Sequence, residues 1–311
     1  MAKSIHRYTG ISITYLVTFF LLTNFSVQAQ VRVGRNLGLQ SKILDQKISY
    51  SVILPSTYHL SSERYPVIYL LHGFGGNHES WLDRCKIDHM VDSLIKEGDI
   101  GEFIYIIPDA KNSYYINNYD SSFLYHDFFV KELVPTIDSL FRTRKQREFR
   151  ALMGLSMGGF GSIILAVENP VLFGSVVAMS PAIRNQDIFK ALPHDTYDRF
   201  FGSVYGSGLE GDERITQHWM ENSPFVLIDS TTARNYLGIN WYIDCGLYDP
   251  LLPASEAFHQ LLLKYQIPHE LHIRPGGHNW EYWYHSTVSG LIYLSNKLMP
   301  PFNHAQNYGD Q

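Results

Sequence analysis

The chain has 311 residues, of which 45 % are apolar and 18 % are charged, and its formal net charge is −5. This composition excludes disordered, collagen-like and disulfide-framework proteins, and mild acidity without a basic stripe argues against nucleic acid as a partner. Aromatic residues reach 14 %, a surplus that suits either a cleft for rings or sugars or a tightly packed core.

The first 29 residues have the three parts of a secretory signal peptide. Lys3 and Arg7 precede an apolar run over 11–22, and Val27 and Ala29 are the small residues of a cleavage site. The run is shorter than the roughly 20 residues that a membrane span needs. We therefore expect cleavage near Ala29, a secreted or periplasmic mature protein and no stable membrane anchor, with a retained anchor as the alternative.

Strand-like and helix-like segments alternate after the leader. Continuous apolar strands separated by helical patterns indicate an α/β fold with a mostly parallel central sheet and helices on both faces. The stretch 182–240 breaks this rhythm, so we expect it to be a short lid-like insertion within a single domain over 30–311. The predicted strands are 47–54, 66–71, 103–107, 149–153, 175–179, 241–245 and 270–274, and the predicted helices are 87–96, 128–140, 157–167, 255–265 and 281–297.

The strand predicted at 66–71 ends in a glycine-rich loop that begins His72-Gly73-Phe74. A loop at this place can supply an N–H group to an oxyanion, and the backbone N–H groups of Phe74 and Met157 are the candidates. The rival is a phosphate-binding loop, but His78 replaces the third glycine of a dinucleotide fingerprint and no G-K-[ST] follows. His72 is expected to pack beside the loop.

Four aromatic residues are candidates for the walls of a substrate cleft. Tyr114 and Tyr115 follow the strand predicted at 103–107 and therefore belong to the carboxyl edge of the predicted sheet. Trp280 and Trp283 approach that edge from the other end of the chain. We expect these four rings to contact substrate, with packing of the lid against the sheet as the alternative.

A turn that begins at Gly154 and ends at Gly158 carries the candidate nucleophile, Ser156. In a G-x-S-x-G elbow the serine sits on a sharp strand-to-helix turn, and the helix N-terminus favours developing negative charge. A strand and a helix are predicted on either side, which is the context that the motif requires. A glycine-rich turn with a passive serine is the alternative.

Two late loops supply a candidate acid and a candidate base. Asp249 is favoured over Asp244 as the acid, because Asp249 lies past the strand end, where sites of open α/β sheets form. His278 follows two glycines in a similar loop. The chain order Ser156, Asp249, His278 is that of α/β-hydrolases.

The sequence contains no metal-ligand spacing, so we expect no metal and no cofactor. Cys85 and Cys245 lie in apolar segments, which predicts two buried free thiols, although export would permit a disulfide.

Together these segments resemble the esterase family of α/β-hydrolases that includes feruloyl esterases, acetyl xylan esterases, S-formylglutathione hydrolases and mycolyltransferases. The resemblance implies the α/β-hydrolase fold, a triad of Ser156, Asp249 and His278, and oxyanion donors at Phe74 and Met157. The leader departs from the cytosolic S-formylglutathione hydrolases and fits secreted branches that deacylate plant polysaccharides. The matching stretches span 65–283 in family order: YPVIYLLHGFGG, IIPDAKNSYYINN, FVKELVPTID, RALMGLSMGGFGS, LFGSVVAMSPA, DCGLYDPLL and PGGHNWEYW.

The residues and the resemblance together predict an exported serine carboxylesterase that acts on acylated carbohydrates, with feruloyl or acetyl esters as substrates. The expected partner is a small-molecule or oligosaccharide ester, and the oligomeric state stays open. Two alternatives remain: an acyltransferase that uses the same acyl-enzyme, and a catalytically inactive binding relative.

Overall fold

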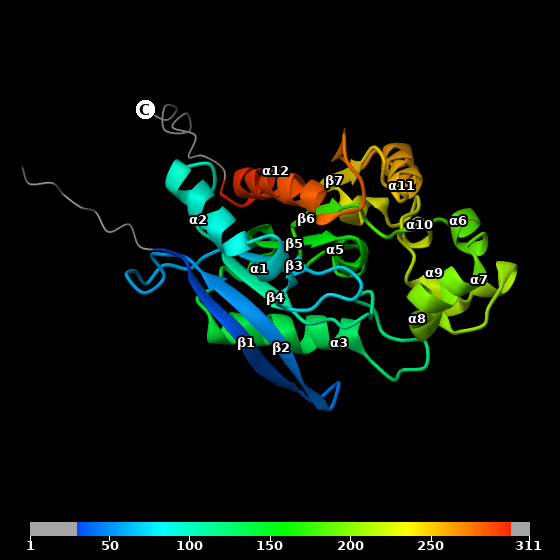
Figure 1. Ribbon diagram of the computed structural model, residues 1–311, viewed down its shortest axis with the longest axis horizontal. Helices are drawn as coiled ribbons and strands as arrows, with labels where there is room; N and C mark the ends of the chain where they lie inside the picture. The colour runs from blue at the N-terminus through cyan, green and yellow to red at the C-terminus, as the bar shows by residue number, and fades with distance from the viewer. Residues whose placement is uncertain (1–29, 300–311) are drawn as a thin grey trace, which may run out of the picture.

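The computed structural model describes residues 30–299, and the predicted signal peptide lies outside them (Figure 1). Within that range eight strands form one sheet in the order β1-β2-β4-β3-β5-β6-β7-β8. β2 pairs antiparallel with both β1 and β4, and all other pairs are parallel, which confirms the predicted α/β fold. The strands are β1 Arg32–Ser41, β2 Gln46–Leu54, β3 Val67–Leu71, β4 Ile104–Pro108, β5 Arg150–Leu155, β6 Ser175–Met179, β7 Asn240–Gly246 and β8 His269–Arg274.

The central strands are buried on both faces, as their continuous apolar sequences predict. In β3, Tyr69 packs into one hydrophobic layer and its neighbours Ile68 and Leu70 into the other, because successive side chains of a strand alternate between faces. Seven strands were predicted, and the structure confirms all seven to within two residues at each end. β1 was not predicted, because it is an edge strand with mostly exposed polar residues and an irregular register between Gly34 and Leu37.

Helices cover both faces of the sheet (Figure 1). One layer contains α1 (Ser80–Arg84), α2 (Ile87–Glu97) and α12 (Trp280–Leu298). The other contains α5 (Met157–Glu168), α11 (Leu252–Lys264) and the consecutive turns α3 (Tyr125–Phe128), η1 (Phe129–Leu133) and α4 (Val134–Leu140). The five predicted helices are confirmed, although the one predicted at 128–140 begins earlier and winds as a π-helix over η1. The 3₁₀ turn η2 (Arg147–Phe149) leads into β5.

The stretch between β6 and β7, called the insertion below, folds into short helices grouped beside the sheet (Figure 1). Phe189 contacts the rings of Tyr197, Phe201 and Trp219 there, and this aromatic group is continuous with the hydrophobic layer on the α5 face of the sheet. Its elements are α6 (Gln186–Lys190), α7 (His194–Tyr197), η3 (Asp198–Gly202), α8 (Ser203–Tyr205), η4 (Gly211–Arg214), α9 (Gln217–Glu221), α10 (Pro224–Leu227) and η5 (Ala233–Tyr236).

None of the helices between residues 30 and 299 combines the length and the apolar character that crossing a bilayer requires.

Candidate active site

Ser156 occupies the sharp turn between β5 and α5, with φ 55° and ψ −117°, a conformation that non-glycine residues rarely adopt. The flanking glycines make this turn possible. A Cβ on Gly158 would lie 2.2 Å from the Leu71 carbonyl oxygen, and one on Gly154 would lie 2.1 Å from the Gly158 carbonyl oxygen. The backbone therefore crosses β3 closely, and the Ser156 side chain is left at the carboxyl edge of the sheet.

Asp249 and His278 reach the same edge from the loops after β7 and β8. These loops lie against one another, since the Tyr248 N–H donates a hydrogen bond of 2.9 Å to the Gly276 carbonyl oxygen. His278 Nδ1 is 2.9 Å from Asp249 Oδ2, and His278 Nε2 is 2.9 Å from Ser156 Oγ. An imidazole held between a carboxylate and a serine hydroxyl can take the serine proton during attack on a carbonyl carbon.

The Asp249 side chain is fully buried, whereas the His278 side chain is 29 % exposed. Burial raises the pKa of the Asp249 carboxyl, but hydrogen bonds from His278, the Leu251 N–H and Ser180 outweigh burial and leave this pKa below its ordinary value. Asp249 is therefore ionised at neutral pH and can stabilise a positively charged imidazole.

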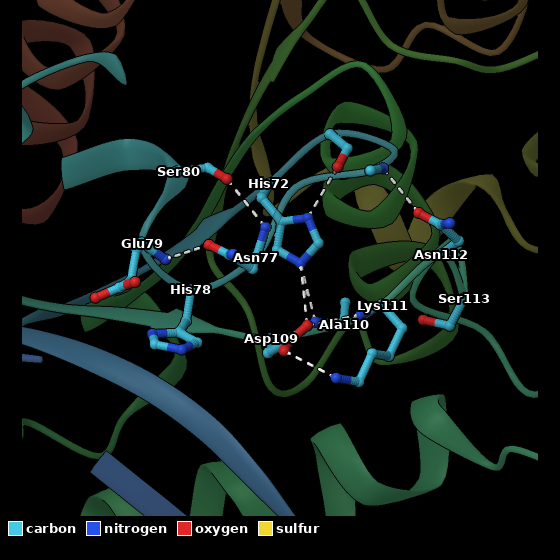
Figure 2. A network of polar contacts seen from close by, with 12 residues as sticks. His72, Asn77, His78, Glu79, Ser80, Asp109, Ala110, Lys111, Asn112 and Ser113 are labelled. Carbon is cyan, nitrogen blue, oxygen red and sulfur yellow. Dashed lines mark hydrogen bonds and ion pairs between the residues drawn. The ribbon is translucent and has the colours of Figure 1, made fainter. Parts of the chain in front are cut away.

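The glycine-rich loop after β3 is ordered by His72, which is wholly buried. Its Nδ1 lies 2.9 Å from the Gly73 carbonyl oxygen and must donate to it, and its Nε2 accepts a 2.9 Å hydrogen bond from the Ala110 N–H. The Gly75 N–H donates to Asn112 Oδ1 over 2.7 Å. Figure 2 shows this network joining the loop to the segment after β4 (Ile104–Pro108).

This loop and the start of α5 present two backbone N–H groups beside Ser156. Met157 is the first residue of α5, so its N–H has no intrahelical acceptor. Among the hydrogen bonds of residues 30–299, neither Phe74 nor Met157 donates its backbone N–H to another group. Two such groups can bind an oxyanion.

Asp244, the second carboxylate weighed as the acid, lies inside β7 and is wholly buried. It accepts hydrogen bonds from Ser286 over 2.7 Å and from Tyr282, both on α12, and it pairs with Arg274 at the end of β8. These contacts join α12 to the sheet, and none of them involves Ser156 or His278.

A cleft of about 460 Å³ opens over Ser156 and His278. Trp280 and Trp283 line it on one side, and Phe200 of the insertion lines it as well. Trp280 is partly exposed, whereas Trp283 is only 6 % exposed and lies edge-on to His278, with ring centroids 4.8 Å apart.

Tyr114 and Tyr115 do not line this cleft. Both have positive φ angles and are buried. The Tyr115 hydroxyl donates to the His72 carbonyl oxygen over 3.0 Å, and its ring packs so closely on α5 that a Cβ on Gly161 would lie 2.3 Å from it. Tyr114 contacts Phe201 of the insertion, with centroids 5.0 Å apart. In this structure both tyrosines therefore pack the loop and the insertion against the sheet.

Cys85 and Cys245 are buried free thiols, as predicted. Burial raises the pKa of each to about 12. Within residues 30–299 no cluster of His, Cys, Asp and Glu side chains could hold a metal ion.

Sequence reasoning missed several residues around the site. Asn112 lies in a stretch that was singled out only for its tyrosines, and Ser180 follows β6 directly. Arg84 and Arg199 line the cleft from segments that are far apart in the chain. No local pattern distinguishes these two arginines from ordinary surface arginines, so only their convergence in space identifies them.

The strand order, the elbow and the geometry around His278 are those of an α/β-hydrolase. Residues 41–294 match the family described as "Putative esterase", and the chain belongs to this family.

Individual relatives agree with that assignment. The chain is 30 % identical over 248 residues to an esterase of Mycobacterium tuberculosis, covering 73 % of this chain and 52 % of that protein. It is 25 % identical over 278 residues to an acetyl esterase of Caldicellulosiruptor saccharolyticus, covering 83 % of this chain and 97 % of that protein. The solved structure of a ferulic acid esterase superposes with a TM-score of 0.73 at 28 % identity, covering 86 % of this chain and 99 % of that one. The chain thus spans about half the length of the mycobacterial relative.

Proposed function

We propose that this protein is an exported serine carboxylesterase and that it acts on acylated carbohydrates. The observation that carries the proposal is the position of His278, whose two ring nitrogens lie 2.9 Å from Ser156 Oγ and 2.9 Å from Asp249 Oδ2. Membership of the esterase family supports hydrolysis of ester bonds.

In the proposed reaction Ser156 Oγ attacks the ester carbonyl carbon while His278 Nε2 takes the hydroxyl proton. The N–H groups of Phe74 and Met157 stabilise the oxyanion of the tetrahedral intermediate. His278 then gives its proton to the departing alcohol, which leaves an acyl group on Ser156. Water, deprotonated by His278, attacks the acyl carbonyl, and collapse of the second intermediate releases the carboxylic acid and restores Ser156.

The substrate class rests on relatives named as acetyl and ferulic acid esterases and on the aromatic walls of the cleft. Trp280 and Phe200 are the rings that a sugar or phenolic group would meet, because they line the cleft and are partly exposed. Export rests on the predicted signal peptide, and we take residues 30–311 as the mature domain.

A fluorophosphonate probe tests the reaction class on the purified mature protein. We expect stoichiometric labelling of Ser156, no labelling of Ser156→Ala and retained labelling of Ser80→Ala. Ser80 is the matched control, because it lines the same cleft but its hydroxyl accepts the Asn77 N–H instead of contacting an imidazole. Failure of the wild-type protein to label would instead favour an inactive binding relative. A panel of p-nitrophenyl, acetyl-sugar and feruloyl-sugar esters then tests the substrate class.

A further inference from the structure

Two arginines line the cleft beside Ser156. Arg84 is the last residue of α1, and Arg199 belongs to η3 of the insertion. Both side chains are exposed, and the Arg199 guanidinium lies 5.2 Å from the Phe200 ring centroid. Two segments more than a hundred residues apart therefore bring positive charge to the opening of one cleft.

Neither arginine is neutralised by a carboxylate. Among residues 30–299 no ion pair or hydrogen bond involves the guanidinium of Arg84 or Arg199. The acids next to them in the chain are engaged elsewhere: Asp83 pairs with Arg35 over 2.8 Å, and Asp198 contacts His194 over 3.3 Å.

The rest of the cleft lining does not offset this positive charge. Of the residues that line it, none is Asp or Glu. The chain as a whole is acidic, with a formal charge of −5, so the pair is not part of a generally basic surface. A guanidinium binds carboxylates through two parallel hydrogen bonds, and a cleft lined by one sign of charge also attracts the opposite charge.

We propose that the cleft selects esters that carry a carboxylate, and that Arg84 and Arg199 bind that group while Ser156 attacks the ester. This proposal rests on the proposed esterase function and narrows its substrate class. The carboxylate can belong to the alcohol part, as in an acylated uronic acid, or to the acyl part, as in a half-ester of a dicarboxylic acid.

Matched substrates test the proposal by a ratio of rates. One pair is acetylated glucuronic acid and acetylated glucose, and the other is p-nitrophenyl hemisuccinate and p-nitrophenyl butyrate, whose acyl chains have the same length. The readout is kcat/KM for the anionic ester divided by kcat/KM for its neutral partner. We expect Arg84→Met or Arg199→Met to lower this ratio about tenfold for at least one pair. The pair that responds identifies which part of the substrate carries the carboxylate.

Three controls test whether the positive charge at the cleft is responsible. Methionine keeps much of the apolar stem of arginine. Arg84→Lys and Arg199→Lys keep the charge but lose the two parallel hydrogen bonds, so the lysine variants should retain more of the ratio than the methionine variants. Arg234→Met removes an exposed arginine that does not line the cleft, and we expect it to leave the ratio unchanged. Raising the salt concentration should lower the wild-type ratio, because ions screen exposed charges. A ratio that is the same in the wild type and both methionine variants, for both pairs, would overturn the proposal.

A binding measurement separates this proposal from the esterase function. Calorimetric titration of Ser156→Ala with glucuronate and with glucose requires no turnover. Weaker binding of glucuronate after Arg84→Met or Arg199→Met in this background would support the anion site even if no ester were hydrolysed. Equal binding of the two sugars, together with no tighter binding of succinate than of butyrate in the same titration, would count against the anion site while leaving the hydrolysis of neutral esters untouched.

Discussion

The indole N–H of Trp283 donates a hydrogen bond to Ser180 Oγ over 3.1 Å. The same indole lies edge-on to His278, at an interplanar angle of 84°. Ser180 is wholly buried and lies beside the Asp249 carboxylate, whose pKa it helps to lower. One tryptophan therefore contacts His278 directly and Asp249 through a single serine.

This relationship predicts that Trp283 acts mainly by positioning His278 and Asp249. Trp283→Phe keeps an aromatic edge near His278 but removes the N–H donor, and Ser180→Ala removes the hydroxyl. We expect each to lower kcat about three- to tenfold with little change in KM, the size of one hydrogen bond. Trp280→Phe is the comparison, because Trp280 is more exposed in the cleft. If Trp283→Phe instead raised KM for feruloyl or sugar esters only, Trp283 would be a substrate-binding residue.

Removing the Ser156 hydroxyl tests the proposed nucleophile. Ser156→Ala should lower kcat by several orders of magnitude and leave a small residual rate from the oxyanion donors. The melting temperature should change little, because the variant deletes one oxygen at a partly exposed turn. Near-wild-type hydrolysis of p-nitrophenyl acetate by this variant would exclude the mechanism.

The two buried aspartates should separate activity from stability. Asp249→Asn should lower kcat strongly, because His278 is left in the wrong tautomer. The corresponding change in a serine protease lowers kcat by about 10⁴. Asp244→Asn should lower the free energy of unfolding by about 2 kcal/mol or more, since Arg274, Tyr282 and Ser286 lose a buried carboxylate. Urea unfolding and steady-state kinetics on both variants provide the check. A well-folded but inactive Asp244→Asn would reverse the two assignments.

His72 should make stability depend on pH. Burial lowers the pKa of His72 below its ordinary value of 6.5, although its Gly73 hydrogen bond and Asp109 oppose burial. As the pH falls through 6.5, the unfolded chain binds a proton at His72 and the folded chain does not, so the free energy of unfolding falls.

The His72→Gln variant cannot take up that proton, and its side-chain amide can still hydrogen-bond the glycine-rich loop after β3. The wild-type protein should therefore lose more stability than His72→Gln between pH 7.5 and pH 5.5, by urea unfolding. Asp109, His78 and Lys111 face His72 and are present in both proteins, so the comparison isolates His72. Parallel pH dependences in the two proteins would contradict this role of His72.

The two thiols should be inert in the folded protein. Because burial raises the pKa of Cys85 and Cys245 to about 12, the thiolate fraction at pH 8 is about a thousandfold below that of an ordinary cysteine. We expect no reaction with a thiol reagent such as DTNB in native buffer and two reactive thiols per chain in urea. Fast labelling of the native protein would show that one of these segments opens to solvent.

The sequence alone determined the features that depend on local patterns. Apolar runs predicted the parallel strands, and the glycines of the elbow predicted Ser156 as the candidate nucleophile. Asp249 and His278 could be placed at the same edge as Ser156, because the carboxyl ends of parallel strands lie at one edge of a sheet whatever packs around them. The edge strand β1 lacked such a pattern and was missed.

Only the tertiary structure decided which side chains face the cleft. Tyr115 follows β4 at the carboxyl edge of the sheet, where Ser156 also lies. Because Gly161 on α5 leaves space for the Tyr115 ring, the ring lies inside the protein. Arg84 and Arg199 line the same cleft only because α1 and the insertion pack at the same edge of the sheet. Where a side chain points depends on neighbours contributed by distant segments, and no local spacing in the sequence encodes that choice.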